Sequence, residues 1–289
     1  MNILITGASG LLGSSILSIL PDDYKIYTLG RNKPDQSNNH IEIDFNFDWS
    51  ISVLPKKMDV VIHLAQSSAH KDFPKSALEI FNVNLASTAL LLDYAKNANC
   101  KRFILASTGG IYKPNSSPLN EDSELLEPSD LGYYFSSKIS SEMIASNYRS
   151  LMEVNVLRIF FMFGIRQRPE MFIPSLIKKV LNNETIVLNG ENGISINPVY
   201  VDDVAKVIAN LLKAGGPKTI NAAGGDVITI REIVEFIGNY LNVKPRFQIK
   251  EALPNLIANT ESFNNVHQDK TTSIHEGLEI MLSNFLSKS

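Results

Sequence analysis

A glycine-rich loop near the N-terminus constrains the fold of this chain more than any other feature. The loop Gly7-Ala8-Ser9-Gly10-Leu11-Leu12-Gly13 follows the apolar run Asn2–Thr6 and opens a helical pattern that Pro21 ends. Glycine permits a tight turn at Gly7, a close backbone approach to a pyrophosphate at Gly10, and helix–strand contact at Gly13. Free N–H groups at the helix N-terminus then favour phosphate. We therefore expect a dinucleotide to be bound by Gly7, Ser9, Gly10, Leu11, Leu12 and Gly13.

The first half of the chain alternates between short apolar runs and helical patterns. The expected strands are Asn2–Thr6, Tyr24–Leu29, Asp59–Leu64, Arg102–Ser107 and Val154–Phe161. The expected helices are Leu11–Leu20, Ala77–Asn97 and Tyr133–Arg149. Strands that are apolar on both faces are typical of a parallel sheet covered by helices. The pattern predicts an α/β fold with a Rossmann-type, doubly wound parallel sheet and right-handed crossovers.

After Gly164 the pattern becomes less regular. Expected helices cover residues 169–183, 202–214, 229–241 and 272–286, with short strands at 186–188 and 246–249. We interpret this part as a smaller C-terminal substrate-binding cap. The predicted Rossmann domain covers residues 1–164 with a contribution from about 197–222, and the predicted cap covers 165–196 and 223–289.

Charge and composition exclude several classes of function. Lysine and arginine number 27 against 30 aspartate and glutamate residues, and the signs are mixed, so we expect no nucleic-acid partner and no membrane partner. No apolar run approaches the ~20 residues of a membrane-spanning helix. Cys100 is the only cysteine, and no Cys/His cluster has metal-ligand spacing, so we expect no disulfide and no metal. The expected location is the cytoplasm.

The end of the second expected strand bears on the choice of dinucleotide. NAD-binding proteins place an acidic residue there for the ribose 2′-hydroxyl, whereas this chain has Gly30, Arg31 and Asn32. A guanidinium without a carboxylate suits a 2′-phosphate, so of NAD and NADP the sequence slightly favours NADP. Alternatively, Arg31 stacks on adenine or faces solvent. Asp44 and Phe45, which lie between the expected strands Tyr24–Leu29 and Asp59–Leu64, are expected near the adenine amine and ring.

A candidate acid–base pair begins the helix Tyr133–Arg149. The spacing of Tyr134 and Lys138 places both side chains on one face of that helix. A phenol has a pKa of about 10, and a nearby ammonium would lower that pKa and make Tyr134 a usable general acid/base. Thr108 follows the strand Arg102–Ser107, at the edge where open α/β sheets bind ligands. The three residues predict proton transfer at a substrate oxygen.

With these motifs the sequence resembles extended short-chain dehydrogenase/reductases of the NAD-dependent epimerase/dehydratase family. Its Gly7–Gly13 loop has the family's Gly-x-x-Gly-x-x-Gly form, and Thr108, Tyr134 and Lys138 fall on the family's catalytic triad. Matching segments are His63-Leu64-Ala65, Asn84 to Thr88, Leu157 to Gly164, Val199 to Val204 and Asn221 to Gly225. The resemblance implies that Leu64, Ala65, Asn84 and Lys138 also lie at the cofactor. Alternatively, Asn84 orders backbone or water behind the active site.

Other polar residues of these segments have structural interpretations. His63 either lines the cofactor site or is a buried, hydrogen-bonded histidine. Asp202 and Asp203 are expected to cap the helix that follows them. Glu142, one turn after Lys138, is expected to form an ion pair and not to act as a catalyst.

The chain departs from the family pattern at the expected substrate. Members that act on nucleotide sugars tend to hold the diphosphate with an Asn where this chain has Phe161, and with an Arg where it has Ser195-Ile196-Asn197-Pro198. Arg166 and Arg168 are candidate replacements. The family's dehydratases have Asp and Glu where this chain has Gly109 and Gly110, which argues against a 4,6-dehydratase.

The leading hypothesis is an NAD(P)-dependent epimerase or ketone reductase acting on a nucleotide sugar or a related hydroxy/keto compound. In it Tyr134 moves the proton, Lys138 tunes Tyr134, and Thr108 orients the substrate oxygen. The alternative is a non-catalytic dinucleotide-sensing protein with the same fold. Apolar positions beyond one face of the helices Ala77–Asn97 and Tyr133–Arg149 also predict a homodimer, because family members often dimerise through these helices.

Overall fold

The computed structural model describes residues 1–69 and 72–287. It divides into two compact units. The first unit comprises Met1–Ile111, Glu124–Arg158 and Ala205–Ile220, and the second comprises Tyr112–Ser123, Ile159–Val204 and the chain from Asn221 onward. Within the described residues, no helix is both long enough and apolar enough to cross a membrane.

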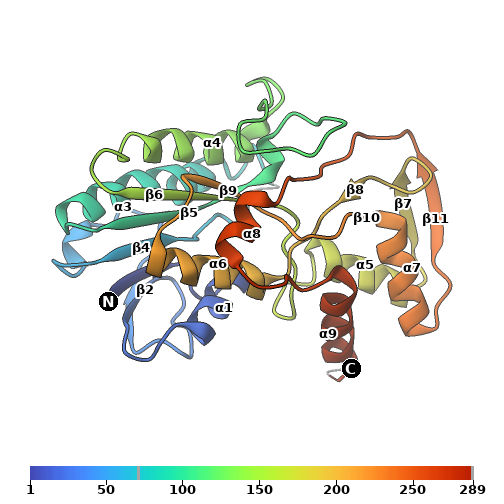
Figure 1. The fold of residues 1–289 in the computed structure, drawn as a ribbon, viewed down its shortest axis with the longest axis horizontal. Helices are drawn as coiled ribbons and strands as arrows, with labels where there is room; N and C mark the ends of the chain where they lie inside the picture. The colour runs from blue at the N-terminus through green and yellow to red at the C-terminus, as the bar shows by residue number, and fades with distance from the viewer. Residues whose placement is uncertain (70–71, 288–289) are drawn as a thin grey trace. The chain divides into compact units, whose positions relative to one another are not determined.

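The main sheet has seven strands in the order β3-β2-β1-β4-β5-β6-β9 (Figure 1). Its strands are β1 Asn2–Thr6, β2 Lys25–Gly30, β3 Asn39–Glu42, β4 Val60–His63, β5 Arg102–Thr108, β6 Glu153–Ile159 and β9 Thr219–Ala222. The pairs β1–β2, β1–β4, β2–β3 and β4–β5 are parallel. The strand order reverses between β1 and β4, the switch point at which such sheets bind dinucleotides. The predicted fold class is confirmed.

Helices cover both faces of this sheet. In Figure 1, α3 and α4 lie on one side of the strands, and α1 and α6 lie on the other. The helices are α1 Leu11–Ile19, α2 Ala77–Ile80, α3 Ser87–Asn97, α4 Gly132–Ser146 and α6 Val201–Ala214, with short 3₁₀ turns at Ile51–Val53 and Gly109–Ile111. The helix expected over Ala77–Asn97 is continuous, but its middle, Phe81–Ala86, is a π-helix. Such segments are frequent at functional sites.

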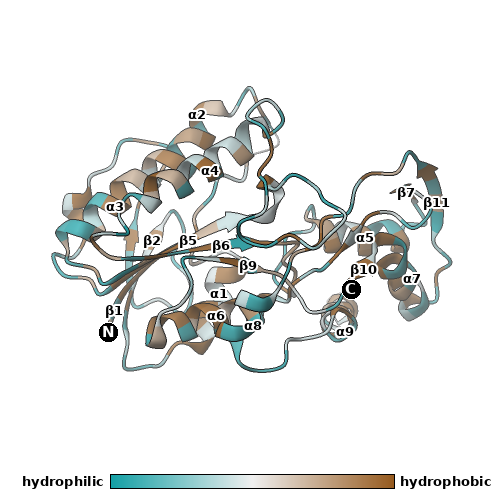
Figure 2. Cartoon of the chain, turned by 45° about the horizontal axis from the view of Figure 1, so that its top comes forward, coloured by the Kyte–Doolittle hydropathy of each residue, from teal (hydrophilic) through white to brown (hydrophobic). Residues whose placement is uncertain are grey.

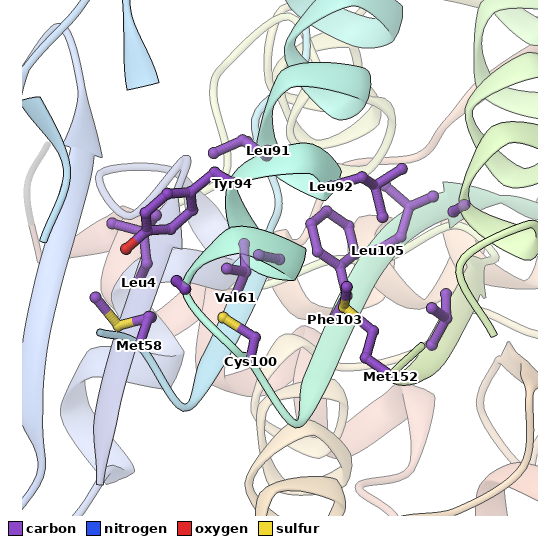
Figure 3. Close-up of a cluster of buried hydrophobic side chains, with 14 of the residues drawn as sticks. Leu4, Met58, Val61, Leu91, Leu92, Tyr94, Cys100, Phe103, Leu105 and Met152 are labelled. Carbon is purple, nitrogen blue, oxygen red and sulfur yellow. The ribbon is translucent and has the colours of Figure 1, made fainter. Parts of the chain in front are cut away.

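The core of the first unit forms where apolar strand residues meet α3 (Figure 3). Leu4, Val61 and Phe103 come from three adjacent strands, and Leu91 and Leu92 from the helix, and all five are fully buried. Figure 2 shows the hydrophobic colour along the strands of this sheet, as expected when both faces are covered. This packing fixes the strand ends, which carry the candidate site.

The second unit has two small sheets and its own core. β7 Thr185–Asn189 pairs in parallel with β11 Arg246–Lys250, and β8 Ser195–Ile196 pairs antiparallel with β10 Ile228–Thr229. Its helices are α5 Phe172–Leu181, α7 Ile230–Leu241, α8 Glu261–His267 and α9 Ile274–Leu286. A Thr229–Glu232 capping box starts α7 where the sequence predicts a helix. The two-residue strands and the seven-residue helix α8 were not predicted, because such short segments give little periodic signal.

Candidate active site

The glycine loop joins β1 to α1 in a conformation that requires its glycines. Gly7 has φ +68°, in the left-handed region, and a Cβ there would lie 2.9 Å from the Ala65 nitrogen. A Cβ on Gly13 would lie 2.4 Å from the Gly7 oxygen and 2.5 Å from the Ala8 Cα. The glycine pattern is therefore needed by the fold at Gly7 and Gly13.

Gly10 differs from these two because its surroundings are open. It is exposed, it is the N-cap of α1, and no side chain caps the helix there. A Cβ on Gly10 would have one close neighbour, the Gly7 oxygen at 3.1 Å. The first N–H groups of a helix have no acceptor within the helix. This cradle of bare backbone and a helix N-terminus fits a pyrophosphate.

The residues expected around the adenosine differ in exposure. Arg31 is exposed at the end of β2, as are Asn32 and Lys33. The Phe45 ring is buried in the core and meets the Trp49 ring edge-on at a centroid distance of 5.3 Å. Asp44 accepts a hydrogen bond from the Asn46 N–H. The Phe45 ring is therefore packed inside the protein, so only its backbone could contact a ligand.

Thr6 ties the ends of β1 and β4 together beside the glycine loop. Its hydroxyl accepts hydrogen bonds from the Leu64 and Ala65 N–H groups, both at 3.1 Å, and lies 2.7 Å from His63 Nδ1. A hydroxyl has one proton to donate, so that proton goes to Nδ1 and the His63 ring carries its own on Nε2. Leu64 and Ala65 thus form the wall next to Gly7, and their contact with a cofactor stays a prediction.

His63 is a structural histidine. Its Nε2 lies 3.1 Å from the Thr88 hydroxyl and 3.2 Å from the Ser87 hydroxyl. Each of these hydroxyls donates its own proton to a helix carbonyl, so each accepts from Nε2–H. Burial, together with the charge of Lys138, lowers the pKa of His63 to about 3. Of the two interpretations of His63, the structure supports the buried, hydrogen-bonded one.

Tyr134 lies in the first turn of α4 and turns its hydroxyl toward the segment after β4. The Tyr134 hydroxyl donates a hydrogen bond of 2.9 Å to Gln66 Oε1. Gln66 is exposed and follows Ala65 directly. Sequence reasoning missed Gln66, although its position just after the His63-Leu64-Ala65 segment was a usable signal.

Lys138 and Thr108 both lie at the carboxyl end of β5. Lys138 is 4% exposed, and its ammonium donates a hydrogen bond of 3.0 Å to the Ala106 carbonyl. Thr108 ends the strand two residues later, and its hydroxyl accepts from the Gly110 N–H at 3.2 Å. The Thr108 O–H proton is therefore available to a substrate oxygen. The structure brings Tyr134 and Lys138 to one face of α4, as the spacing predicts.

The pKa of the candidate acid differs from the expectation. Burial raises the pKa of Tyr134 to about 12. Burial also lowers the pKa of Lys138 to about 8, while Glu142 acts in the opposite direction. Burial is the cause of the raised Tyr134 pKa, so the lowering by Lys138 that the sequence predicts is not found, and the Lys138 ammonium donates to the Ala106 carbonyl instead. At neutral pH Tyr134 is therefore a phenol, and its hydroxyl donates to Gln66.

Asn84, in the π-helical segment, connects the two walls of the site. Its Oδ1 accepts from the Ser67 N–H at 2.8 Å, and its Nδ2 donates to the Ser137 hydroxyl at 2.9 Å. Ser137 in turn donates to the Tyr134 carbonyl. Asn84 thus fixes the segment that carries Gln66 relative to the start of α4. Direct contact between Asn84 and a cofactor stays a prediction.

Glu142 forms the ion pair expected of it, and its partner is Arg158 on β6. The Arg158 Nη2 lies 2.8 Å from Glu142 Oε2, and Nε lies 3.2 Å from both carboxylate oxygens. The Ser107 hydroxyl donates to the same carboxylate. Glu142, Arg158 and Ser107 are all buried. This pair lies directly behind Thr108 and Lys138.

Gly109 and Gly110 leave no acid at the two positions where dehydratases have one. A Cβ on Gly110 would lie 2.5 Å from two ring carbons of Phe135. The Phe135 ring, on the first turn of α4, therefore fills the space that a side chain at 110 would need. This packing supports the expectation that the chain is not a 4,6-dehydratase.

The second unit contains the positions at which related enzymes hold the diphosphate. In this chain the side chains there are apolar or are hydrogen-bonded within the protein. Phe161 has φ +43°, a conformation that suits Asn or Gly better than Phe, and its ring lies 5.9 Å from that of Phe172. Ile196 is fully buried, and the Asn197 amide bonds the backbone of Ala258 through both its oxygen and its nitrogen. Arg166 and Arg168 are exposed. They remain the candidate phosphate ligands of this unit.

The expected capping role of Asp203 is wrong. α6 begins at Val201, and the Asp203 carboxylate accepts from the Thr272 N–H at 2.8 Å and pairs with His267 Nε2 at 3.1 Å. Burial would raise the pKa of Asp203, but these hydrogen bonds outweigh it and lower that pKa. Asp203 thus joins α6 to the segments around α8 and α9 and does not serve as a helix cap.

No three His, Cys, Asp or Glu side chains within the described part of the chain are grouped as a metal site would require. The candidate site therefore consists of the Gly7–Gly13 loop and the side chains of Thr108, Tyr134 and Lys138, with Gln66 hydrogen-bonded to Tyr134. A family model, the NAD dependent epimerase/dehydratase family, matches residues 3–223. The chain belongs to this family. Because this is a family of enzymes, its match argues against the alternative hypothesis of a non-catalytic dinucleotide-sensing protein.

Two relatives of this chain have names that specify a nucleotide sugar as the substrate. A UDP-glucuronate 4-epimerase of Thermodesulfobacterium geofontis is 27% identical over 265 residues, which are 84% of this chain and 81% of the relative. A dTDP-D-glucose 4,6-dehydratase of Dictyostelium discoideum is 28% identical over 255 residues, which are 78% of this chain and 58% of the relative.

Among solved structures, the UDP-glucuronic acid 4-epimerase of Bacillus cereus, in complex with UDP-glucuronic acid and NAD, has the same fold. Its TM-score is 0.87 at 22% identity, with 100% of both chains covered. That structure contains NAD. It therefore does not support the prediction, made from the sequence, that this chain prefers NADP.

Proposed function

We propose that this enzyme is a nucleotide-sugar epimerase that inverts a carbon bearing a hydroxyl group, with a nicotinamide dinucleotide on the Gly7–Gly13 loop. The observation that carries the proposal is the arrangement of Tyr134, Lys138 and Thr108 at the carboxyl end of β5, with glycines where a dehydratase has acids. The epimerase names of its relatives support the same substrate class.

The reaction assigns a task to each side chain. A dinucleotide held by the Gly7–Gly13 loop would supply the hydride acceptor and donor that inversion of a sugar carbon needs. Tyr134, in its phenolate form, would take the proton of the sugar hydroxyl at its Oη and would return it to the same substrate oxygen after the hydride has come back. Thr108 donates a hydrogen bond to that oxygen. Lys138, one turn away on α4, would stabilise the phenolate form of Tyr134 through its positive charge.

The test is product analysis by ¹H NMR with a panel of UDP- and dTDP-sugars and either dinucleotide. We expect one sugar of the panel to yield its epimer with only catalytic dinucleotide. Formation of a dehydrated keto sugar, or no product from any sugar, would contradict the proposal.

A ketone reductase is the second candidate, favoured by the residues after β2. A reductase releases oxidised cofactor at each turnover and therefore consumes reduced dinucleotide stoichiometrically. Arg31 and Lys33 are exposed cations at the edge where the ribose 2′ position is expected, and no acidic residue ends β2. Stoichiometric consumption of reduced dinucleotide in the NMR experiment would favour this candidate over the epimerase.

Arg31 gives the dinucleotide preference a direct test. Replacing Arg31 by Ala is expected to weaken NADP binding by about 10- to 100-fold, because a charge-assisted hydrogen bond to the 2′-phosphate is lost. NAD binding should change by less than about twofold. Calorimetry with both dinucleotides measures this, with Lys56→Ala, an exposed cation before the amino end of β4, as the control. Equal losses for NAD and NADP would refute a 2′-phosphate contact.

We also propose a homodimer through α2–α3 and α4, which cover one face of the sheet. Leu78 on α2 is 76% exposed and Met143 on α4 is 65% exposed, and Phe81 and Leu90 are exposed as well. Apolar side chains gathered on one helical surface are typical of interfaces. We expect sedimentation to give a two-chain particle that Leu78→Glu with Met143→Glu turns into a monomer. Val187→Glu, at another exposed apolar position, should leave the particle unchanged.

A further inference from the structure

A buried charge cluster lies directly behind the proposed acid–base pair. Glu142 is held by the Arg158 guanidinium and by the Ser107 hydroxyl. Ser107 follows Ala106, whose carbonyl accepts from Lys138. Lys138 and Glu142 are one turn apart on α4. Lys138 therefore bonds Ala106 of β5, and Glu142 bonds the next residue of that strand, Ser107.

Lys138 needs an opposing charge because it has lost most of its contact with water. Its side chain is almost fully buried, and its ammonium has a carbonyl oxygen as its hydrogen-bond partner. Burial of this kind favours the neutral amine.

The charged and titratable groups around Lys138 are few. Tyr134 and Glu142 lie on its own helix, His63 faces it from β4 as a neutral ring, and Arg158 reaches Glu142 from β6. Among these groups, Glu142 is the one that carries a negative charge.

We propose that the Ser107–Glu142–Arg158 cluster is a positioning device that keeps Lys138 protonated, and that Arg158 limits how strongly Glu142 does so. The proposal rests on the proposed use of Lys138 in the reaction. Glu142 and Arg158 touch neither substrate nor cofactor in this account, and both act through Lys138. The burial-lowered pKa of Lys138, about 8, lies close to neutrality, so a change in the charge of the cluster alters the fraction of charged lysine under ordinary conditions.

The test uses two isosteric variants whose predicted effects have opposite signs. Glu142→Gln leaves the Arg158 charge uncompensated, which should lower the titration midpoint of Lys138 by about one pH unit or more. Arg158→Gln leaves the carboxylate uncompensated, which should raise that midpoint. The midpoint is read by NMR of protein labelled with [ε-¹³C]lysine, and the signal is assigned by its absence in Lys138→Arg. A purely structural role predicts no such opposition.

A second variant covers the case in which a half-broken buried pair does not fold. Replacing both partners of a buried pair is commonly tolerated where removing one is not. Glu142→Gln with Arg158→Gln should therefore fold and should lower the midpoint below that of the wild type, because Glu142 is the group that acts on Lys138. Midpoints that stay at the wild-type value in the double variant, or that move in one direction in both single variants, overturn the proposal.

The NMR readout separates this proposal from the proposed function, because it needs neither substrate nor turnover. If the enzyme epimerises a sugar, the pH profile of kcat/KM should move in the same direction as the midpoint in each variant. If no sugar is turned over but the midpoints move as described, the proposed function fails and the role of the cluster stands.

Discussion

Replacing Tyr134 by Phe is expected to lower epimerase turnover by about 10²- to 10⁴-fold, the contribution typical of a positioned general acid/base. Phenylalanine keeps the ring that packs beside Phe135 and loses only the hydroxyl that donates to Gln66. Dinucleotide affinity should change by less than about twofold, since the glycine loop is untouched. The measurement is steady-state kinetics on the sugar that the NMR panel identifies, with calorimetry for the dinucleotide.

Tyr133 is the matched control for this loss. It is the preceding residue on α4, and its ring stacks on Phe73 with a centroid distance of 4.8 Å. Tyr133→Phe removes the same atom one position away and should retain turnover within about threefold. If Tyr134→Phe is as active as Tyr133→Phe, the proton transfer assigned to Tyr134 is wrong.

The second large effect is expected at Gly13, where alanine should lower the free energy of unfolding by about 3 kcal/mol or more. Its Cβ would stand 2.4 Å from the Gly7 oxygen and 2.5 Å from the Ala8 Cα, both of which are backbone atoms that cannot rotate away. Overpacking of this kind commonly costs about 1–3 kcal/mol, and more where nothing can yield. Denaturant unfolding followed by circular dichroism measures the difference.

Two other glycines separate folding from binding. Gly10→Ala should fold with a loss below about 1 kcal/mol, because its Cβ meets a single oxygen at 3.1 Å. It should nevertheless weaken dinucleotide binding by about 100-fold, because the methyl group stands where the pyrophosphate approaches. Gly225→Ala, with one neighbour at 3.4 Å, should change neither quantity. A Gly10→Ala protein that binds dinucleotide like the wild type would remove the pyrophosphate from this loop.

Much of the first unit was predictable because local signals and the global fold agree there. Apolar runs of buried parallel strands, a glycine loop and Pro21 each have one physical interpretation, and the strand order follows from the alternation of strand and helix. The shared helix face of Tyr134 and Lys138 could also be predicted, because the i, i+4 spacing on a helix puts both side chains there whatever surrounds them.

What escaped prediction depends on contacts between distant residues. The pKa of Tyr134 is set by burial, which the helical spacing does not reveal. Asp203 reads as a helix cap from its neighbours in sequence, and only the fold brings Thr272 and His267 to it. Glu142 likewise finds its partner on β6, and a residue 16 positions away leaves no periodic signal.

The most direct test of the central claim follows the hydrogen atom that the enzyme is proposed to move. The wild-type protein is incubated with catalytic dinucleotide and the reactive sugar nucleotide, deuterated at the carbon that is inverted, and the product is examined by NMR and mass spectrometry. We expect an epimer that retains its deuterium, because the same hydride leaves and returns, and we expect no epimer with Tyr134→Phe on the same timescale. An epimer that has lost its deuterium, or one formed equally well by Tyr134→Phe, would contradict the account.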